Sequence, residues 1–145
     1  MQVNIETILN HFTQIRKYYA SEVRKRLNDI NLSPSEISIL ILLSSNQSIN
    51  TSSQLVVLLG ISKGLVSRSI DSLQKKGLLE CQQDLKDRRV LQLFLTKQAS
   101  SIIQRLQSEI KKINNEVLGD IPEADIKQME KTMSEIVRHF KNVVD

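Results

Sequence analysis

One junction in the middle of the chain, Gly60-Ile61-Ser62, constrains the fold more than any other feature. Before it, the segment from Thr51 to Gln54 has the pattern of a capping box, which predicts a short helix ended by Gly60. After it, Ser62 is of the residue type that caps the start of a helix, so only Ile61 separates the two helices. Two helices joined by so tight a turn, with glycine at its start, define a helix-turn-helix.

The helix that follows the junction is amphipathic. We expect it to run from Ser62 to Lys76 and to stop at Gly77, with three side chains facing the core: Val66, Ile70 and Leu73. A DNA major groove accepts one α-helix, and the residues that touch base edges come from the N-terminal half of that helix. The candidate DNA contacts are therefore Ser62, Lys63, Gly64, Ser67 and Arg68.

Each candidate suits a different contact. Arg68 can donate a bidentate pair of hydrogen bonds to guanine, and Lys63 can reach guanine or a phosphate. The serines can bond to a base or a phosphate, while Gly64 lets the backbone approach DNA closely at a cost in helix stability. The alternative is an exposed helix face without a partner.

A basic hairpin is expected after this helix. Residues 78–83 and 89–95 are predicted strands, and around the polar turn between them lie Lys86, Arg88 and Arg89 beside Asp87. Adjacent arginines at a hairpin tip suit the narrow minor groove, where the negative potential is enhanced. Phosphate would repel Asp87, so we expect its carboxylate to accept a hydrogen bond from Arg89 and hold the guanidinium in an inserting pose. A surface ion pair of little energetic value is the competing interpretation.

The excess positive charge lies in this part of the chain. Residues 60–97 hold eight lysines and arginines against four aspartates and glutamates, a net +4 that equals the formal net charge of the whole chain. A focused positive patch is what the neutralisation of phosphates requires. On charge alone, a solvated surface with a lysine-rich helix end is the alternative.

Long helices are expected on both sides of the helix-turn-helix and hairpin. Aromatic residues make up 3% of the chain and tryptophan is absent, so leucine, isoleucine and valine must build the core, as suits helices packing on helices. Apolar residues at helical spacing predict one helix from residue 3 to about residue 30. A second helix then starts at Ser33, Pro34 and Glu36, with a serine cap, a proline in the first position and a glutamate able to reach back to the cap.

Two further helices are predicted after the hairpin. Thr96 is expected to cap a helix whose apolar stripe extends to Val117 and which Gly119 closes, and the last helix follows Glu123. The terminal helices have more apolar side chains than a small winged helix could cover, so a helical partner surface is expected. The predicted fold class is mainly α with a small β-wing, a winged helix-turn-helix with long terminal dimerisation helices.

The sequence gives little support to other classes of protein. The N-terminus has no cationic leader before an apolar run, and no segment approaches the roughly 20 apolar residues of a membrane span, so we expect a cytoplasmic protein that does not bind membranes. Cys81 is the single cysteine and is interpreted as a packed side chain, with a redox switch as the alternative. His11 and His139 lie far apart in the sequence, so we expect no metal site and no cofactor. Without a catalytic triad or a glycine-rich phosphate loop, an enzyme is not expected.

Two motifs resemble the MarR family of winged-helix transcriptional regulators. The first, from Gly60 to Gly77, reads Gly-Ile-Ser-Lys-x-x-Val-Ser-Arg-x-Ile-Asp-x-Leu-x-x-x-Gly. The second runs from Asp84 to Arg89 and on to a Leu-Thr pair, and is similar to the wing signature of the family. The resemblance covers the whole chain, and the two motifs together are specific to the family.

The resemblance implies a homodimer held by the first, fifth and sixth helices, each subunit reading one half of a palindromic operator. It places the helix from Ser62 in the major groove and Arg89, oriented by Asp87, in the minor groove, with half-sites about 34–36 Å apart. Regulators of this family often release DNA on binding a small phenolic or lipophilic effector. We expect Phe12 and Tyr19 either to line such a pocket or to pack in the core. The expected dimer contacts are Ile5, Ile8, Phe12, Ile126, Ile136, Phe140 and Val143.

Three residues depart from the family pattern and bear on DNA recognition. Gly64 and Leu65 stand where small polar residues are common, and Ser72 stands where a basic residue is frequent. We predict one MarR-like domain over residues 1–145, in which residues 33–96 bind DNA and residues 1–30 and 97–145 dimerise. The predicted function is a ligand-responsive, sequence-specific repressor of transcription. The alternative is a protein-interaction module that keeps the winged-helix fold and does not bind DNA.

Overall fold

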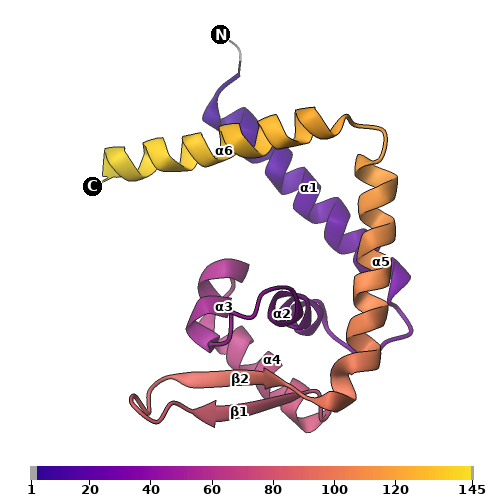
Figure 1. Cartoon of the computed structure of the whole chain (residues 1–145), viewed down its shortest axis with the longest axis vertical. Coiled ribbons are helices and arrows are strands. Elements are labelled where there is room, and N and C mark those ends of the chain that lie inside the picture. The colour runs from indigo at the N-terminus through magenta and orange to yellow at the C-terminus, as the bar shows by residue number, and fades with distance from the viewer. Residues whose placement is uncertain (1–2, 145) are drawn as a thin grey trace. The chain divides into compact units, whose positions relative to one another are not determined.

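The computed structural model describes residues 3–144, which are mainly helical with one two-stranded sheet. It divides into two compact units, which we call unit 1 (Met1–Ile110) and unit 2 (Lys111–Asp145) and describe separately. This composition confirms the predicted winged helix-turn-helix fold class. In chain order the elements are α1 (Ile5–Arg26), α2 (Pro34–Ser45), α3 (Ser52–Leu59), α4 (Lys63–Lys75), β1 (Leu79–Gln83), β2 (Leu91–Leu95), the short 3₁₀ helix η1 (Lys97–Ala99), α5 (Ser100–Leu118) and α6 (Glu123–Val144) (Figure 1).

The predicted helix starts are confirmed by their hydrogen bonds. Ser33 caps α2 by accepting from the backbone N–H of Glu36 at 3.2 Å, and Ser62 caps α4 by accepting from that of Leu65 at 3.1 Å. Thr51 and Gln54 make the complete capping box at the start of α3. Gly60 ends that helix with φ of 64°, a left-handed conformation that glycine adopts without steric penalty. The tight turn between α3 and α4 is therefore built from residues suited to it.

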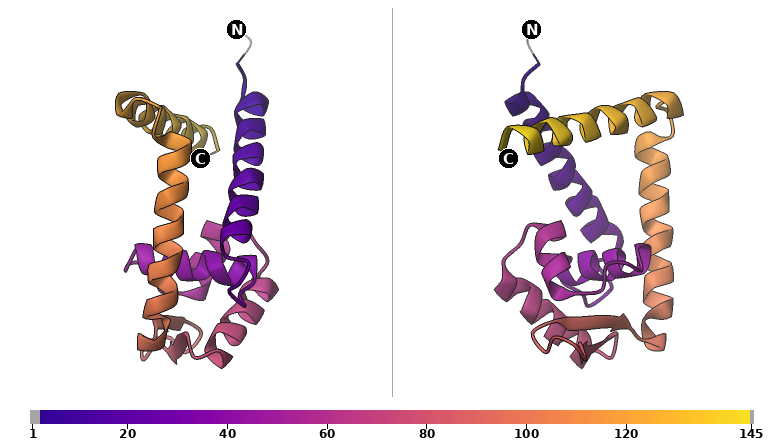
Figure 2. Two further views of the ribbon diagram at one scale, coloured as in Figure 1. Left: turned by 90° about the vertical axis from the view of Figure 1, so that its right-hand side faces the viewer. Right: turned by 60° about the vertical axis from the view of Figure 1, so that its left-hand side comes forward.

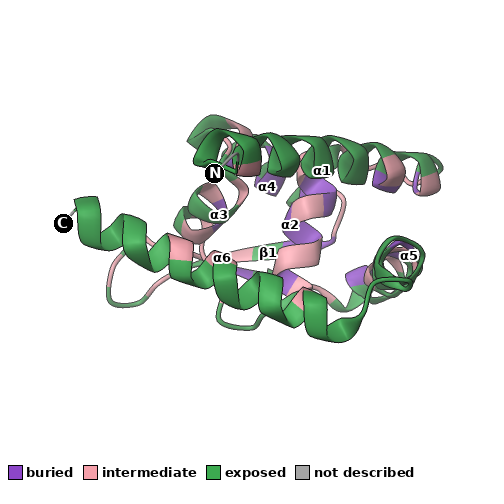
Figure 3. Cartoon of the chain, turned by 90° about the horizontal axis from the view of Figure 1, so that it is seen from above, coloured by how far each residue is buried: buried purple, intermediate pink, exposed green. Residues whose placement is uncertain are grey.

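The core of unit 1 forms where α4 packs against α2, α3 and β1. These elements lie together in both views of Figure 2. The predicted core residues of α4 are buried, and so are the side chains opposite them on α2 and α3; the set includes Ile39, Leu40, Leu55, Val66, Ile70 and Leu73. Figure 3 shows buried residues on α2 and α4, whereas the ribbon of α6 is mostly exposed. The face of α4 that carries Val66, Ile70 and Leu73 thus packs in the core.

The hairpin pairs β1 with β2 in antiparallel register, from Leu79 opposite Leu95 to Gln83 opposite Leu91. The backbone N–H of Leu93 also donates to the carbonyl of Asn50 at 2.8 Å, which joins β2 to the segment before α3. The second strand was predicted to begin at residue 89, which is wrong by two residues. The reason is that Val90 closes the turn, donating to the carbonyl of Asp87 at 3.0 Å.

Thr96 does not cap a helix with its side chain, contrary to the sequence prediction. Its hydroxyl instead donates to the carbonyl of Gly77 at 2.7 Å, and η1 precedes α5. Gly77 has φ of 76° and ends α4 as predicted. The bond therefore ties the end of the hairpin to the end of α4.

Ion pairs connect the end of α1 and the turn after it to α5 within unit 1. The two terminal nitrogens of Arg105 each bind one carboxylate oxygen of Asp29 at 2.6 Å. Arg26 bonds Glu22 on its own helix at 2.9 Å and lies 3.9 Å from Glu109 on α5. The bidentate geometry of the Arg105 pair gives it more directional strength than a single surface contact.

Candidate nucleic-acid interface

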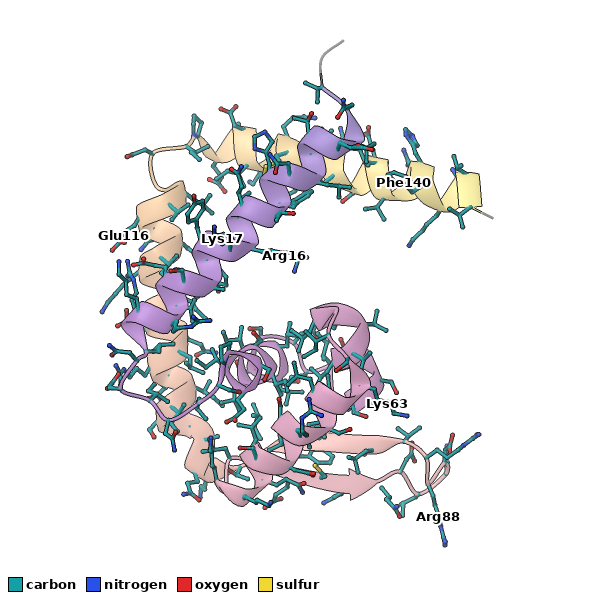
Figure 4. All side chains as sticks on the ribbon, turned by 180° about the vertical axis from the view of Figure 1, so that it is seen from behind. Arg16, Lys17, Lys63, Arg88, Glu116 and Phe140 are labelled. Atoms are coloured by element: carbon teal, nitrogen blue, oxygen red, sulfur yellow. The ribbon has the colours of Figure 1, made fainter. Side chains whose placement is uncertain are left out.

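The N-terminal half of α4 presents the predicted contact residues to solvent. Ser62, Lys63, Gly64, Ser67 and Arg68 are all exposed. The Ser62 hydroxyl accepts the capping hydrogen bond, so this side chain already stabilises the start of α4. The Lys63 side chain, at the start of α4, points away from the ribbon in Figure 4. The structure thus brings all five candidates to one end of one helix.

Gly64 provides space for the side chain of Arg68. A Cβ atom placed on Gly64 would lie 3.2 Å from the Nη1 atom of Arg68, which is closer than side chains ordinarily allow. The two residues are one helical turn apart, so the arginine lies back over the glycine. With any other residue at position 64 the guanidinium would have to move.

The turn of the hairpin is organised by two aspartates. The carboxylate of Asp84 accepts from the backbone N–H of Lys86 at 2.9 Å. That of Asp87 accepts from the backbone N–H of Arg89 at 3.0 Å and from its Nε at 3.2 Å, with Nη2 at 3.4 Å. The structure therefore contains the Asp87–Arg89 pair that the sequence predicted.

The guanidinium of Arg89 is held by this pair and is still open to solvent. Its side chain is 91% exposed, and Arg88 points outward from the hairpin in Figure 4. The side-chain hydrogen bond from Arg89, followed by the bond from its backbone N–H, lowers the pKa of Asp87 below its usual range. An exposed pair of this kind adds little to folding stability. Its main effect is to restrict the orientation of Arg89.

Sequence reasoning assigned Glu36 to the cap of α2, and that assignment is wrong. Its carboxylate accepts from the hydroxyl of Ser72 at 3.1 Å and from the Nζ of Lys76 at 2.7 Å, both on α4. Lys76 is therefore engaged inside the fold and is not part of the exposed positive patch. A signal was present in the sequence, because Ser69, Ser72 and Lys76 lie at i, i+3 and i+7 and so form a polar stripe on α4.

A cavity of about 320 Å³ lies within unit 1 between the second half of α1 and the first half of α2. Burial raises the pKa of Tyr19, which is one of its lining residues. Both alternatives expected for Phe12 are wrong, because it does not line the cavity and its side chain is exposed rather than packed in the core. Most of the lining side chains are apolar, including Val23, Leu27, Leu32, Ile37 and Ile41. The cavity therefore suits an apolar group.

The other residues considered from the sequence show no built site. Cys81 is partly buried on β1, and burial followed by the charge of Asp71 raises the pKa of its thiol, which disfavours the reactive thiolate. Within residues 3–144 no group of His, Cys, Asp and Glu is placed to hold a metal ion. No helix in the same range is long and apolar enough to cross a membrane.

A helix-turn-helix followed by a basic hairpin defines a winged helix-turn-helix domain. Residues 32–91 match the model of the MarR family. The fold is similar to that of the transcriptional regulator BldR from Sulfolobus solfataricus, with 21% identity, a TM-score of 0.75 and coverage of 92% of this chain and 94% of that one. A MarR transcriptional regulator from Methanosarcina mazei Go1 is 19% identical, with a TM-score of 0.77 and coverage of 95% and 99%.

CouR from Rhodococcus jostii RHA1, solved with p-coumaroyl-CoA bound, is 18% identical, with a TM-score of 0.76 and coverage of 94% and 95%. The resemblance to the MarR family is thus confirmed over residues 32–91, which match the family model. BldR and the Methanosarcina mazei protein are both described as transcriptional regulators.

The Asp87–Arg89 pair gives a prediction about titration. Arg89→Ala removes the largest cause of the low pKa of Asp87, so the pKa should rise towards the ordinary range of an aspartate. Because the folded pKa is depressed, the stabilisation from this pair is present above the unfolded pKa and is lost as pH falls through the folded pKa. Carboxyl ¹³C NMR titration measures the shift, with Lys86→Ala as the control that leaves the pair intact. The same Asp87 pKa in wild type and Arg89→Ala would show that the pair does not form in solution.

Proposed function

We propose that this chain is a sequence-specific DNA-binding regulator of transcription that acts as a homodimer. In this proposal α4 enters the major groove and the hairpin turn enters the adjacent minor groove. The observation that carries the proposal is the exposed, pre-oriented guanidinium of Arg89 on a hairpin that follows a helix-turn-helix. The proposed DNA contacts are Ser62, Lys63, Gly64, Ser67, Arg68, Lys86, Asp87, Arg88 and Arg89, with Asp87 acting through Arg89.

The proposed dimer is supported by apolar side chains that each terminal helix leaves exposed. On α1 these include Ile5 and Phe12, and on α6 they include Phe140 and Val143. Of the remaining expected contacts, Ile8, Ile126 and Ile136 are partly exposed. No described residue of α6 is buried, although its apolar residues recur at helical spacing. A 22-residue amphipathic helix of this kind gains most of its stability by packing its apolar face.

The cavity beside Tyr19 supports a role for a small effector. We propose that it accepts an apolar or aromatic molecule, since apolar side chains line most of it. The relative CouR was solved with p-coumaroyl-CoA, an aromatic thioester, bound. A ligand there would contact Ile37 on α2, the helix against which α4 packs.

Salt dependence tests DNA binding. The probes are a duplex selected from a random-sequence pool and a scrambled duplex of the same composition, titrated at several salt concentrations. Six or more phosphate contacts predict a loss in affinity of about a thousandfold or more between 50 and 200 mM salt. Arg89→Ala should weaken binding to the selected duplex by about tenfold or more, because a hydrogen bond from a charged group is worth about 1.5–3 kcal/mol.

Arg16→Ala is the matched control, because it removes the same charge from α1, outside the helix-turn-helix and hairpin. It should change the affinity by less than about twofold at physiological salt, where charges beyond about 8 Å are screened. A flat salt response would favour the protein-interaction module instead. Equal effects of the two substitutions would exclude an insertion of the hairpin arginine.

Gly64→Ala should leave the melting temperature unchanged or raise it, and should lower the affinity for the selected duplex. Alanine has the higher helix propensity, by up to about 1 kcal/mol, so the melting temperature should stay the same or rise. The added methyl forces the Nη1 atom of Arg68 to shift by a few tenths of an ångström, which weakens a bidentate base contact worth about 1–3 kcal/mol, so affinity for the selected duplex should fall by less than about tenfold. In an Arg68→Ala background the same substitution should have a smaller effect on affinity, because only the close approach of the Gly64 backbone to DNA is then disturbed. An equal loss in both backgrounds would show that the glycine does not act through Arg68.

Sedimentation velocity tests the dimer. The wild-type chain should sediment as a dimer, and Phe140→Asp should raise the dimer dissociation constant by more than about tenfold, because an unpaired carboxylate in an apolar interface costs over 1.4 kcal/mol. Leu85→Asp is the control, since Leu85 is a fully exposed apolar residue in the hairpin turn. A wild-type chain that stays monomeric at high concentration would refute the dimer.

A further inference from the structure

A buried carboxylate joins two segments that are distant in the sequence. The side chain of Glu36, on the first turn of α2, is only 8% exposed. It accepts hydrogen bonds from Ser72 and Lys76 on α4, and Lys76 donates a further bond to the carbonyl of Asn31 at 2.8 Å. Ser35 and Ser69 hydrogen-bond nearby at 2.7 Å between the same two helices. We call Glu36, Ser72 and Lys76 the carboxylate cluster.

The carboxylate cluster gives α4 directional contacts, which its apolar contacts do not provide. Val66, Ile70 and Leu73 are buried, but apolar packing is non-directional and tolerates small rotations and shifts of a helix. Hydrogen bonds weaken steeply away from their preferred distances and angles. Bonds at Ser72 and Lys76, about one turn apart, therefore fix the rotation of α4 about its axis and its position along α2.

The pose fixed in this way determines where the exposed face of α4 points. Arg68 lies one turn before Ser72 on the same helix, so a rotation at the cluster carries the guanidinium with it. Base contacts depend on such placement, whereas phosphate contacts tolerate more variation because they carry no sequence information. A shift of α4 should thus reduce discrimination between sequences more than overall affinity.

We infer that Glu36 is a positioning residue for DNA recognition, holding α4 through Ser72 and Lys76 in the pose that reads bases. This inference rests on the proposed function. Glu36 is buried and acts only through α4. Ser72, which stands where the MarR family frequently has a basic residue, has a role in this inference because its hydroxyl donates to the carboxylate of Glu36.

The test compares the selected and scrambled duplexes defined above, with each variant first shown to be folded by circular dichroism. Glu36→Gln keeps the size of the side chain and removes its charge. It should reduce the ratio of selected to scrambled affinity by about fivefold or more, while affinity for the scrambled duplex and its salt slope stay unchanged. Lys76→Met should act similarly, and Lys76→Arg, which can still donate to the carboxylate, should restore most of the ratio.

Lys75→Met is the matched control, because Lys75 is the exposed neighbour of Lys76 and carries the same charge. It should leave the ratio unchanged. The double variant Glu36→Gln/Lys76→Met should lose less than the product of the two single losses, because either substitution breaks the same bond.

An unchanged ratio in folded Glu36→Gln, even with a lower melting temperature, would overturn the inference and leave a structural role only. If Glu36→Gln does not fold, Ser72→Ala is used in its place, because that substitution removes only one neutral hydrogen-bond donor. Ser72→Ala should lower the ratio of selected to scrambled affinity by about twofold or more. An unchanged ratio in this variant would again overturn the inference. A wild-type chain that prefers no duplex would refute the proposed function, and this inference with it. If the wild type prefers the selected duplex and the variants show the same preference, this inference alone is refuted.

Discussion

The structure depends on how one short helix, α4, is held. Its 13 residues are too few to form a stable helix alone in water, so its stability comes from packing. The face with Val66, Ile70 and Leu73 is buried against α2, α3 and β1, and the opposite side at its N-terminal end stays exposed. The neighbouring elements therefore pack against one side of α4 and leave its other side exposed to solvent. The DNA contacts proposed for α4 all lie on that side.

Most helix starts and ends were predicted well because their signals are local, whereas the first helix ends at Arg26 and not near residue 30 as predicted. Ser33, Thr51 and Ser62 each cap a helix by accepting a bond from a backbone N–H three residues later. Gly60 and Gly77 end helices through their own left-handed backbone conformation. None of these interactions needs a distant partner, so residue type and spacing were sufficient. The fold class followed from the order of the helices and the hairpin.

Two of the errors have the opposite character, since each of these side chains found a partner far along the chain. Glu36 was expected to reach back to the cap of α2 and instead binds residues 36 and 40 positions away. Thr96 was expected to cap a helix and instead binds the carbonyl of Gly77. A buried carboxylate without its charge partner would cost several kcal/mol, so the contact with Lys76 outweighs a local cap. The dimer contacts, the DNA contacts and the division into binding and dimerising parts stay predictions.

Two arginines of the proposed interface, Arg68 and Arg89, are prepared in different ways. Arg89 is held by a carboxylate two residues away, and Arg68 lies over the open side of Gly64. An exposed ion pair contributes little to stability, so the value of the Asp87 contact lies in the conformational freedom that Arg89 has already lost before binding. Immobilising a long side chain costs about 0.5–1.5 kcal/mol on association, and a preformed pair removes part of that cost. Arg68 has no such anchor among its described contacts, so its placement depends on the pose of α4, and hence on Glu36.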